Sequence, residues 1–346
     1  MNIVFVHLNS KIPKFLKSNL ETCLKYFPNS RVYLIHNLVD DNLQIPGVEM
    51  YRYVPRKDWR NLENNLNHPK DFRSNFWLTS LARFIAIADF MQEMPGRVIH
   101  IESDNILASD FPIEKFLKLE SEYAFPIVSK KRGIASLVYF KTAQSSRDLA
   151  DFSLEQAKIN PSTSDMLVLR NFYDLNKDRV QVLPTGLSMQ TSFNNRIDSD
   201  VLKSMNRGME ILGGIFDGSD LGVFFLGTDP RNRRGLSTVG SPVPENYADT
   251  QNWKLIPNVN RKFVDLCVDN STAKVFSLHA TCKRVKLFRP ESQFVRLEKL
   301  LKMSSSGLQT IYYIDVFLLA LLNSSVKKGK LTISRIFKAM NGDKNV

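Results

Sequence analysis

The chain has 346 residues and a formal net charge of +12, with 43% hydrophobic and 24% charged residues. These proportions are those of a globular protein and exclude an intrinsically disordered chain. The length is enough for one large domain with an appendage or for two modest domains.

The positive charge is concentrated near the C-terminus. From Lys254 onward the sequence holds 17 Lys and Arg against six acidic residues, so the preceding part is close to neutral. This distribution disfavours a uniformly basic nucleic-acid binder. It favours a basic C-terminal face that meets anionic lipid, a phosphorylated substrate or an acidic partner, while a solvated surface that only aids solubility is an equal alternative.

Targeting and membrane signals are weak. The N-terminus has no basic stretch ahead of its short apolar run, which predicts a first strand and not a signal peptide. The longest later apolar run, residues 316–322, is far below the roughly 20 residues that span a bilayer, so we expect no transmembrane segment. Three cysteines without paired spacing suit a reducing compartment, and we expect a cytoplasmic protein, with peripheral contact at the inner membrane surface as an alternative.

The first elements in chain order form a βαβ unit. Residues 3–8 and 31–36 are β-branched and aromatic strands, and residues 13–26 carry apolar side chains at helical spacing. Such a unit predicts a parallel sheet covered on both faces. Residues 40–69 are predicted to be an irregular connection with a short strand at 49–54.

The clearest helix covers residues 75–94, where an apolar face precedes Pro95-Gly96. The apolar strand 97–101 follows and runs directly into Glu102-Ser103-Asp104-Asn105. Two carboxylates therefore lie at the carboxyl end of a strand, the edge at which open α/β sheets bind ligands.

The later elements are less regular. The region 185–260 is rich in Gly, Asn, Asp and Pro and has little periodicity, as functional loops often do. The other predicted elements are strands at 123–128, 134–140 and 273–278, a helix at 145–158, a helix through 165–169 that Ser162 or Ser164 could cap, and helical structure from 290 onward.

Glu102 and Asp104 are the first candidate site. Where a strand breaks into a turn, two nearby carboxylates can converge on one hard cation, which in turn bridges phosphate oxygens. The alternative is a strand end whose polar side chains satisfy local backbone donors.

The sequence resembles the GT-A glycosyltransferases over roughly residues 3–288. The resemblance begins with Leu81-Ala82-Arg83-Phe84-Ile85 and with the strand that ends in Glu102-Ser103-Asp104, which is similar to the family's D-x-D segment but has Glu in place of the first Asp. Four later segments fit a bacterial-type subgroup: Ser164-Asp165-Met166, Phe216-Asp217-Gly218, Gly227-x-Asp229-Pro230-Arg231-Asn232 and Leu278-His279-x-x-x-Lys283.

This resemblance implies a mixed, mostly parallel α/β sheet flanked by helices, with a GT-A-like domain over residues 1–289 and a basic, mainly helical C-terminal extension over 290–346. The implied reaction moves a sugar, of hexosyl type, from a nucleoside diphosphate sugar to an acceptor hydroxyl in polysaccharide or glycoconjugate synthesis. Inversion and retention of stereochemistry both stay open, as does the identity of the acceptor.

The resemblance also assigns site residues. Asp104, Glu102 and His279 are the expected ligands of Mn²⁺ or Mg²⁺, with Asp104 the strongest, because Glu102 could instead contact the ribose or a metal-bound water. Lys283 is expected to neutralise the departing diphosphate. The expected contacts of the nucleotide sugar are His7, Asn9, Arg83, Glu102 and Lys283.

Asp217 and Asp165 are the candidate catalytic carboxylates. Asp217 could act as the base for the acceptor hydroxyl, although an Asp-Gly turn is an equal alternative. Asp165 ranks below it, as an acceptor-side carboxylate or as a first-turn acid that the helix dipole favours.

Other functions are weaker alternatives. The sequence has no P-loop, dinucleotide-binding fingerprint, hydrolase elbow or zincin motif. Nucleotidyl transfer on a related sheet would predict a Gly- and Arg-rich phosphate loop where residues 9–13 read Asn-Ser-Lys-Ile-Pro. A basic membrane-surface or RNA-binding protein is the non-enzymatic alternative, although most aromatic residues near the C-terminus lie in apolar helical contexts.

Overall fold

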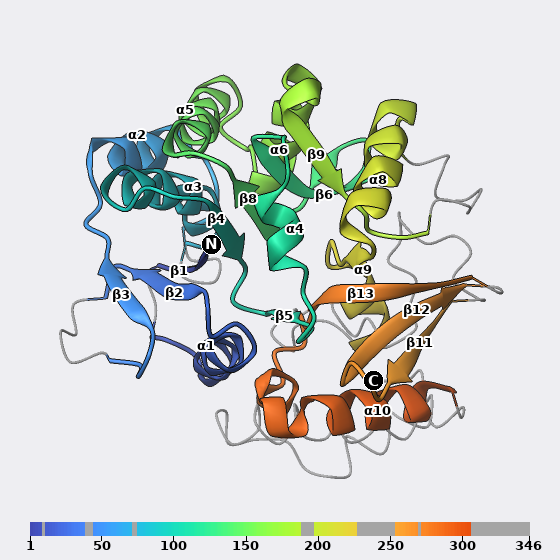
Figure 1. Ribbon diagram of the computed structural model, residues 1–346. Coiled ribbons are helices and arrows are strands. Elements are labelled where there is room, and N and C mark those ends of the chain that lie inside the picture. Colours follow the sequence, from blue (N-terminus) through green and yellow to red (C-terminus); the bar gives the residue numbers. More distant parts are fainter. Residues whose placement is uncertain are drawn as a thin grey trace, which may run out of the picture.

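Two β-sheets, with helices packed around them, make up the described part of the chain (Figure 1). The computed structural model describes residues 1–8, 11–38, 44–70, 75–187, 197–226, 253–268 and 271–305.

The main sheet is mixed and mainly parallel, as the sequence predicts. Its strand order is β3-β2-β1-β4-β8-β6-β7, with β9 beside β6. The strands β3, β2, β1 and β4 are parallel, and so are β6 and β9, whereas β8 runs antiparallel between β4 and β6. The bounds are β1 (Asn2–His7), β2 (Arg31–His36), β3 (Glu49–Arg52), β4 (Val98–Ile101), β6 (Tyr123–Ser129), β7 (Arg132–Gly133), β8 (Leu137–Phe140) and β9 (Val180–Leu183).

Helices cover both faces of the main sheet because its strands are apolar on both sides. One apolar core joins the sheet to α2 (Lys57–Asn65), α3 (Phe76–Glu93), α5 (Ala143–Ile159) and α6 (Asp165–Leu175). The core on the opposite face includes α1 (Lys14–Tyr26) and α4 (Ile113–Leu117). Helix α8 (Ser199–Leu212) packs beside β9, and the short helix η1 (Lys177–Arg179) precedes that strand.

The second sheet has the strand order β10-β13-β12-β11. The short strand β5 pairs with the C-terminal end of β13. Helices α9 and α10 pack on this sheet around a third apolar core. The bounds are β5 (Asn105–Leu107), β10 (Ile215–Phe216), α9 (Asp220–Leu226), β11 (Trp253–Asn258), β12 (Phe263–Val268), β13 (Ser271–His279), η2 (Val285–Phe288) and α10 (Pro290–Ser305).

The connection from β4 to β5 joins the two sheets. After Ile101 the chain leaves the main sheet, turns through residues 102–104 and enters the second sheet as β5, which pairs with the end of β13. The turn that carries Glu102 and Asp104 therefore lies between the sheets, and in Figure 1 it connects the two halves of the molecule.

Two helices correct the sequence predictions. Helix α2 lies in the segment expected to be irregular, and it is held by the burial of Trp59 and Leu62. Helix α8 lies in the region expected to consist of loops; it buries Val201, Met205 and Leu212 and ends at Gly213, whose φ of 81° suits a helix C-cap.

The predicted C-terminal helix begins at Pro290, and its residue Leu297 is buried in the same core as the second sheet. The remainder of the predicted extension lies outside the described residues, and the boundary at residue 290 stays a prediction. Within the described part of the chain, no helix is both long and apolar enough to span a bilayer.

Candidate metal centre at the junction of the two sheets

The turn after β4 is fixed by hydrogen bonds from two asparagines. The side chain of Asn19, on α1, donates to the carbonyls of Ser103 at 3.2 Å and Asn105 at 2.8 Å. The Asn105 side chain donates to the carbonyl of Ser136 at 2.8 Å, and the Glu102 N–H donates to the same carbonyl at 3.0 Å. The backbone of the turn is thus held from both sides.

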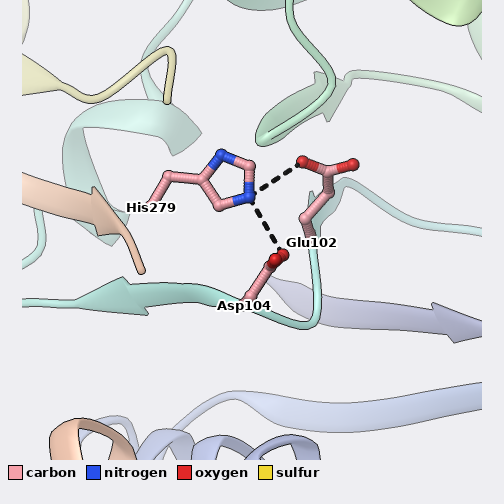
Figure 2. A group of neighbouring side chains, drawn as sticks. All are labelled: Glu102, Asp104 and His279. Carbon is pink, nitrogen blue, oxygen red and sulfur yellow. Dashed lines mark hydrogen bonds and ion pairs between the residues drawn. The ribbon is translucent and has the colours of Figure 1, made fainter. Parts of the chain in front are cut away.

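Strand β13 brings His279 to this turn. His279 pairs with Asn105 across the β5–β13 ladder, and the N–H of Ala280 donates to the carbonyl of Asp104 at 2.7 Å. The imidazole Nε2 of His279 lies 2.9 Å from Asp104 Oδ1 and 3.4 Å from Glu102 Oε2. Figure 2 shows all three side chains converging, with the other ring nitrogen pointing away from both carboxylates.

These three side chains fit a divalent cation. One ligand atom from each of Glu102, Asp104 and His279 lies within 4.8 Å of the others. Neighbouring ligands of a small octahedral cation, at metal–ligand distances near 2.1 Å, are about 3 Å apart, which is close to the two measured separations. Carboxylate oxygens with one imidazole nitrogen are a donor set that suits Mg²⁺ and Mn²⁺.

The charges around the site favour a cation. Burial alone would lower the pKa of His279, but Asp104 and Glu102 outweigh it and raise that pKa to about 9. Burial opposes ionisation of Asp104, yet His279 and Lys283 hold its pKa below its usual range. A positive charge between the carboxylates is therefore favoured, and a metal ion can replace the imidazolium proton in that role.

Lys283 lies beside one of these carboxylates, Asp104. Its ammonium is 3.5 Å from Asp104 Oδ2 and lies over the ring of Phe15, 5.8 Å from the centroid. The backbone of Lys283 is left-handed, with a φ of 52°, a conformation that costs energy for a residue with a Cβ. The chain turns sharply at this position, and the ammonium lies against Asp104.

Arg83 is buried between two carboxylates. Its guanidinium forms ion pairs with Glu102 and, at 3.2 Å, with Asp165 Oδ2, while Nε donates to the carbonyl of Ser80 at 2.7 Å. Burial lowers the pKa of Arg83, but the two carboxylates outweigh it and keep the side chain charged. The sequence predicts Arg83 as a contact of the nucleotide sugar; in the structure it connects the candidate metal ligand Glu102 to Asp165 on helix α6.

Asp165 begins α6, next to the N-cap Ser164, whose hydroxyl accepts the N–H of Leu167 at 3.4 Å. This settles the choice between the two predicted caps. Burial raises the pKa of Asp165, and Arg83 offsets part of that rise. Arg83 alone therefore bridges the carboxylates of Asp165 and Glu102 among the described side chains.

Asp217 belongs to the same region but is fully buried. Oδ1 accepts the N–H of Leu221 at 3.0 Å, and Oδ2 accepts those of Gly222 at 2.7 Å and His279 at 2.9 Å. Burial raises its pKa, against the effect of these partners. The carboxylate is thus directed at backbone amides, an arrangement that differs from the one expected for a base that reaches an acceptor.

The remaining sequence candidates are less defined. His7 ends β1 at the same sheet edge as the turn, and its Nε2 lies 3.3 Å from the carbonyl of Lys11. Asn9 and the segment Gly227-x-Asp229-Pro230-Arg231-Asn232 lie outside the described residues.

Sequence reasoning missed three residues that shape the site. Asn19 is fully buried on the same face of α1 as apolar residues. A polar residue on the apolar face of a predicted helix is a signal that could have identified it. His100 is 1% exposed, and burial, with Arg83 next, lowers its pKa to about 3, so this neutral side chain donates from Nδ1 to the carbonyl of Val4 at 3.1 Å. Ser136, which supports the turn through its carbonyl, carries no comparable signal.

The fold and the site thus define a mixed α/β protein with a candidate divalent-metal centre between two sheets. No protein-family model matches the chain, and no curated protein matches it significantly.

Three similar solved structures are glycosyltransferases. A galactosyltransferase, LgtC, solved with donor and acceptor sugar analogues, is 14% identical over 53% of this chain and 73% of its own, with a TM-score of 0.39. Mouse xyloside xylosyltransferase 1 is 8% identical over 59% of this chain and 93% of its own, with a TM-score of 0.37. A glycosyltransferase involved in glycosylation of the major capsid of PBCV-1 is 11% identical over 53% of this chain and 80% of its own, with a TM-score of 0.34. Because these likenesses are partial, the function must follow from the site itself.

Proposed function

We propose that the chain is a metal-dependent glycosyltransferase, which moves a sugar from a nucleoside diphosphate sugar to an acceptor hydroxyl. The observation that carries this assignment is the convergence of Asp104, Glu102 and His279 at the carboxyl edge of a mainly parallel sheet. Ligands of α/β sheets bind at this edge, and a hard cation there is suited to phosphate oxygens.

Asp104, Glu102 and His279 would hold the Mn²⁺ or Mg²⁺ ion. When bound, that ion supplies positive charge against the charge that develops on the departing diphosphate. The ammonium of Lys283, which lies 3.5 Å from Asp104, would contribute positive charge to the same region. Glu102 is shared between His279 and Arg83, so that it can serve either as a ligand or as a partner of a metal-bound group.

Asp165 is the better candidate for the acceptor-side carboxylate. Burial raises the pKa of both Asp165 and Asp217, so the choice between them rests on their partners and exposure. Both oxygens of Asp217 accept backbone N–H groups and its side chain is fully buried, whereas Asp165 is 7% exposed and one of its oxygens pairs with Arg83. If transfer inverts the sugar, we assign the base role to Asp165.

Donor binding is proposed at the neighbouring strand ends, with His7, Asn9, Arg83, Glu102 and Lys283 as the candidate contacts. Hexosyl transfer, synthesis of a polysaccharide or glycoconjugate and contact of the basic C-terminal region with an anionic membrane surface stay predictions from the sequence.

Isothermal titration with UDP and with GDP, each in the presence and absence of Mn²⁺, tests this function. We expect one nucleotide to bind in a Mn²⁺-dependent manner and an Asp104→Ala variant to lose that dependence. Glu93→Ala, which removes a half-exposed carboxylate paired with Arg56, is the matched control and should bind as the wild type does. Failure of the wild type to bind either nucleotide with Mn²⁺ would contradict the assignment.

A further inference from the structure

The position of His279 depends on a buried carboxylate that does not touch its imidazole. The backbone N–H of His279 donates to Oδ2 of Asp217, which also accepts the N–H of Gly222, while Oδ1 accepts the N–H of Leu221. Asp217 is 0% exposed. One carboxylate thus joins the last residue of β13 to the first turn of α9.

Gly222 brings the two backbones into direct contact. A Cβ placed on this glycine would lie 1.8 Å from the carbonyl oxygen of His279 and 2.7 Å from its carbonyl carbon. Because real Cβ atoms do not approach a backbone so closely, any other residue at this position must displace the peptide of His279 or the helix.

The backbone of Asp217 is itself tied to the metal-binding turn. Its carbonyl accepts the hydroxyl of Ser136 at 2.9 Å, and the carbonyl of Ser136 accepts the N–H of Glu102 at 3.0 Å. On the other side, the N–H of Ala280 donates to the carbonyl of Asp104 at 2.7 Å. Asp217 therefore belongs to a closed set of bonds that includes the backbone of all three candidate ligands.

We propose that Asp217 and Gly222 form a clamp on the peptide of His279, which sets the distance of its imidazole from Asp104 and Glu102. In this role Asp217 is a positioning residue and does not touch the substrate. The clamp deepens the proposed function and rests on it, because it assumes that His279 is a metal ligand. Partners that orient metal ligands typically change metal affinity 10- to 100-fold when removed.

Mn²⁺ binding to the full-length chain gives a readout that is independent of activity. We expect Asp217→Asn, which keeps the shape but presents an amide N–H to one backbone donor, to bind Mn²⁺ about 10- to 100-fold more weakly. Gly222→Ala leaves the charge unchanged and displaces the peptide, and it should have a similar effect. Pulsed EPR should detect the nitrogen coupling of His279 to Mn²⁺ in the wild type and should show it lost or weakened in both variants.

Leu149→Ala is the control for a general loss of stability. Leu149 is a fully buried core residue on α5, so its truncation should lower the thermal midpoint and leave Mn²⁺ affinity and nitrogen coupling unchanged. If one clamp variant does not fold, the other still provides the test, because one changes the carboxylate and the other the backbone contact.

The outcomes separate the clamp from the proposed function. A wild type that binds Mn²⁺, beside two variants that bind within about twofold of it and keep the nitrogen coupling, overturns the clamp alone; that result fits a base role for Asp217, which would slow transfer without weakening metal binding. A wild type that binds no Mn²⁺ overturns the proposed function, and the clamp with it.

Discussion

His279 Nε2 lies 2.9 Å from Asp104 Oδ1, although 175 positions separate the two residues in the sequence. The antiparallel pairing of β5 with β13 produces this proximity, since Asn105 at the start of one strand is the partner of His279 at the end of the other. The candidate metal centre therefore depends on how the second sheet is attached to the first.

Metal binding should release a proton at neutral pH. Because Asp104 and Glu102 raise the pKa of His279 to about 9, the imidazole is charged at pH 7 and must lose its proton before Nε2 can bind a cation. We expect Mn²⁺ affinity to rise with pH, by about tenfold per unit, until the pH reaches about 9. Titration in two buffers of different ionisation enthalpy measures the released proton; release of none, or release unchanged in His279→Gln, would contradict this prediction.

Asn19 should support the turn as well as the fold. Replacing it with Ala leaves the buried carbonyls of Ser103 and Asn105 without this donor, and we expect a loss of about 1–3 kcal/mol in the free energy of unfolding. Asn19→Asp should cost more, because a carboxylate would face two carbonyl oxygens. Both variants should bind Mn²⁺ more weakly than the wild type. Urea denaturation and Mn²⁺ titration together check this, and unchanged values in both would exclude a role for Asn19.

Arg83→Met should be strongly destabilising. It leaves the buried carboxylate of Asp165 without this ion pair and the partly buried Glu102 with His279 as its remaining ion-pair partner in the described part of the chain, and breaking a buried ion pair costs about 3–5 kcal/mol. The matched control is Arg56→Met, which removes an exposed pair with Glu93 and should cost no more than about 1 kcal/mol. Denaturant titration compares the two variants. Equal losses in the free energy of unfolding would show that the ion pairs of Arg83 with Glu102 and Asp165 do not stabilise the protein more than the exposed pair does.

Lys283 should affect nucleotide binding through its charge and stability through its backbone. A contact to a charged group contributes about 1.5–3 kcal/mol. We therefore expect Lys283→Ala and Lys283→Gly both to weaken Mn²⁺-dependent binding of UDP or GDP at least about tenfold. The glycine variant should be the more stable of the two by about 1 kcal/mol, because φ at this position is 52°. Lys286→Ala removes the same charge from an exposed position nearby and should change neither property; a similar effect there would indicate general electrostatics.

Much of the main sheet could be predicted from the sequence because its elements have strong local signals. The predicted strand at 31–36 matches β2, and the predicted helix at 75–94 differs from α3 by one residue at each end. Helix α8 has a local signal, since Val201, Met205 and Leu212 lie at helical spacing, but the many Gly, Asn, Asp and Pro residues of the region 185–260 favoured an interpretation as loops.

The candidate site was predictable in its residue types and less so in its connections. Glu102 and Asp104 follow an apolar strand, which is a local signal, whereas their proximity to His279 comes from pairing across the chain. The same holds for Arg83: its partners Glu102 and Asp165 were both candidates, but its pairing with Asp165 joins positions 82 residues apart. Whether Asp217 faces an acceptor or backbone amides could not be inferred from an Asp-Gly dipeptide, because both arrangements use the same local turn.

The most direct test of the central claim is the anomalous diffraction of Mn²⁺ in crystals of the full chain grown with Mn²⁺ and the nucleotide that binds. We predict one strong anomalous peak in direct contact with Asp104 and His279, with Glu102 bound to the ion or to one of its waters, and with the nucleotide's diphosphate beside the same ion. A peak at another place in the molecule, or a diphosphate bound away from Asp104, would contradict the metal centre and the glycosyl transfer proposed from it.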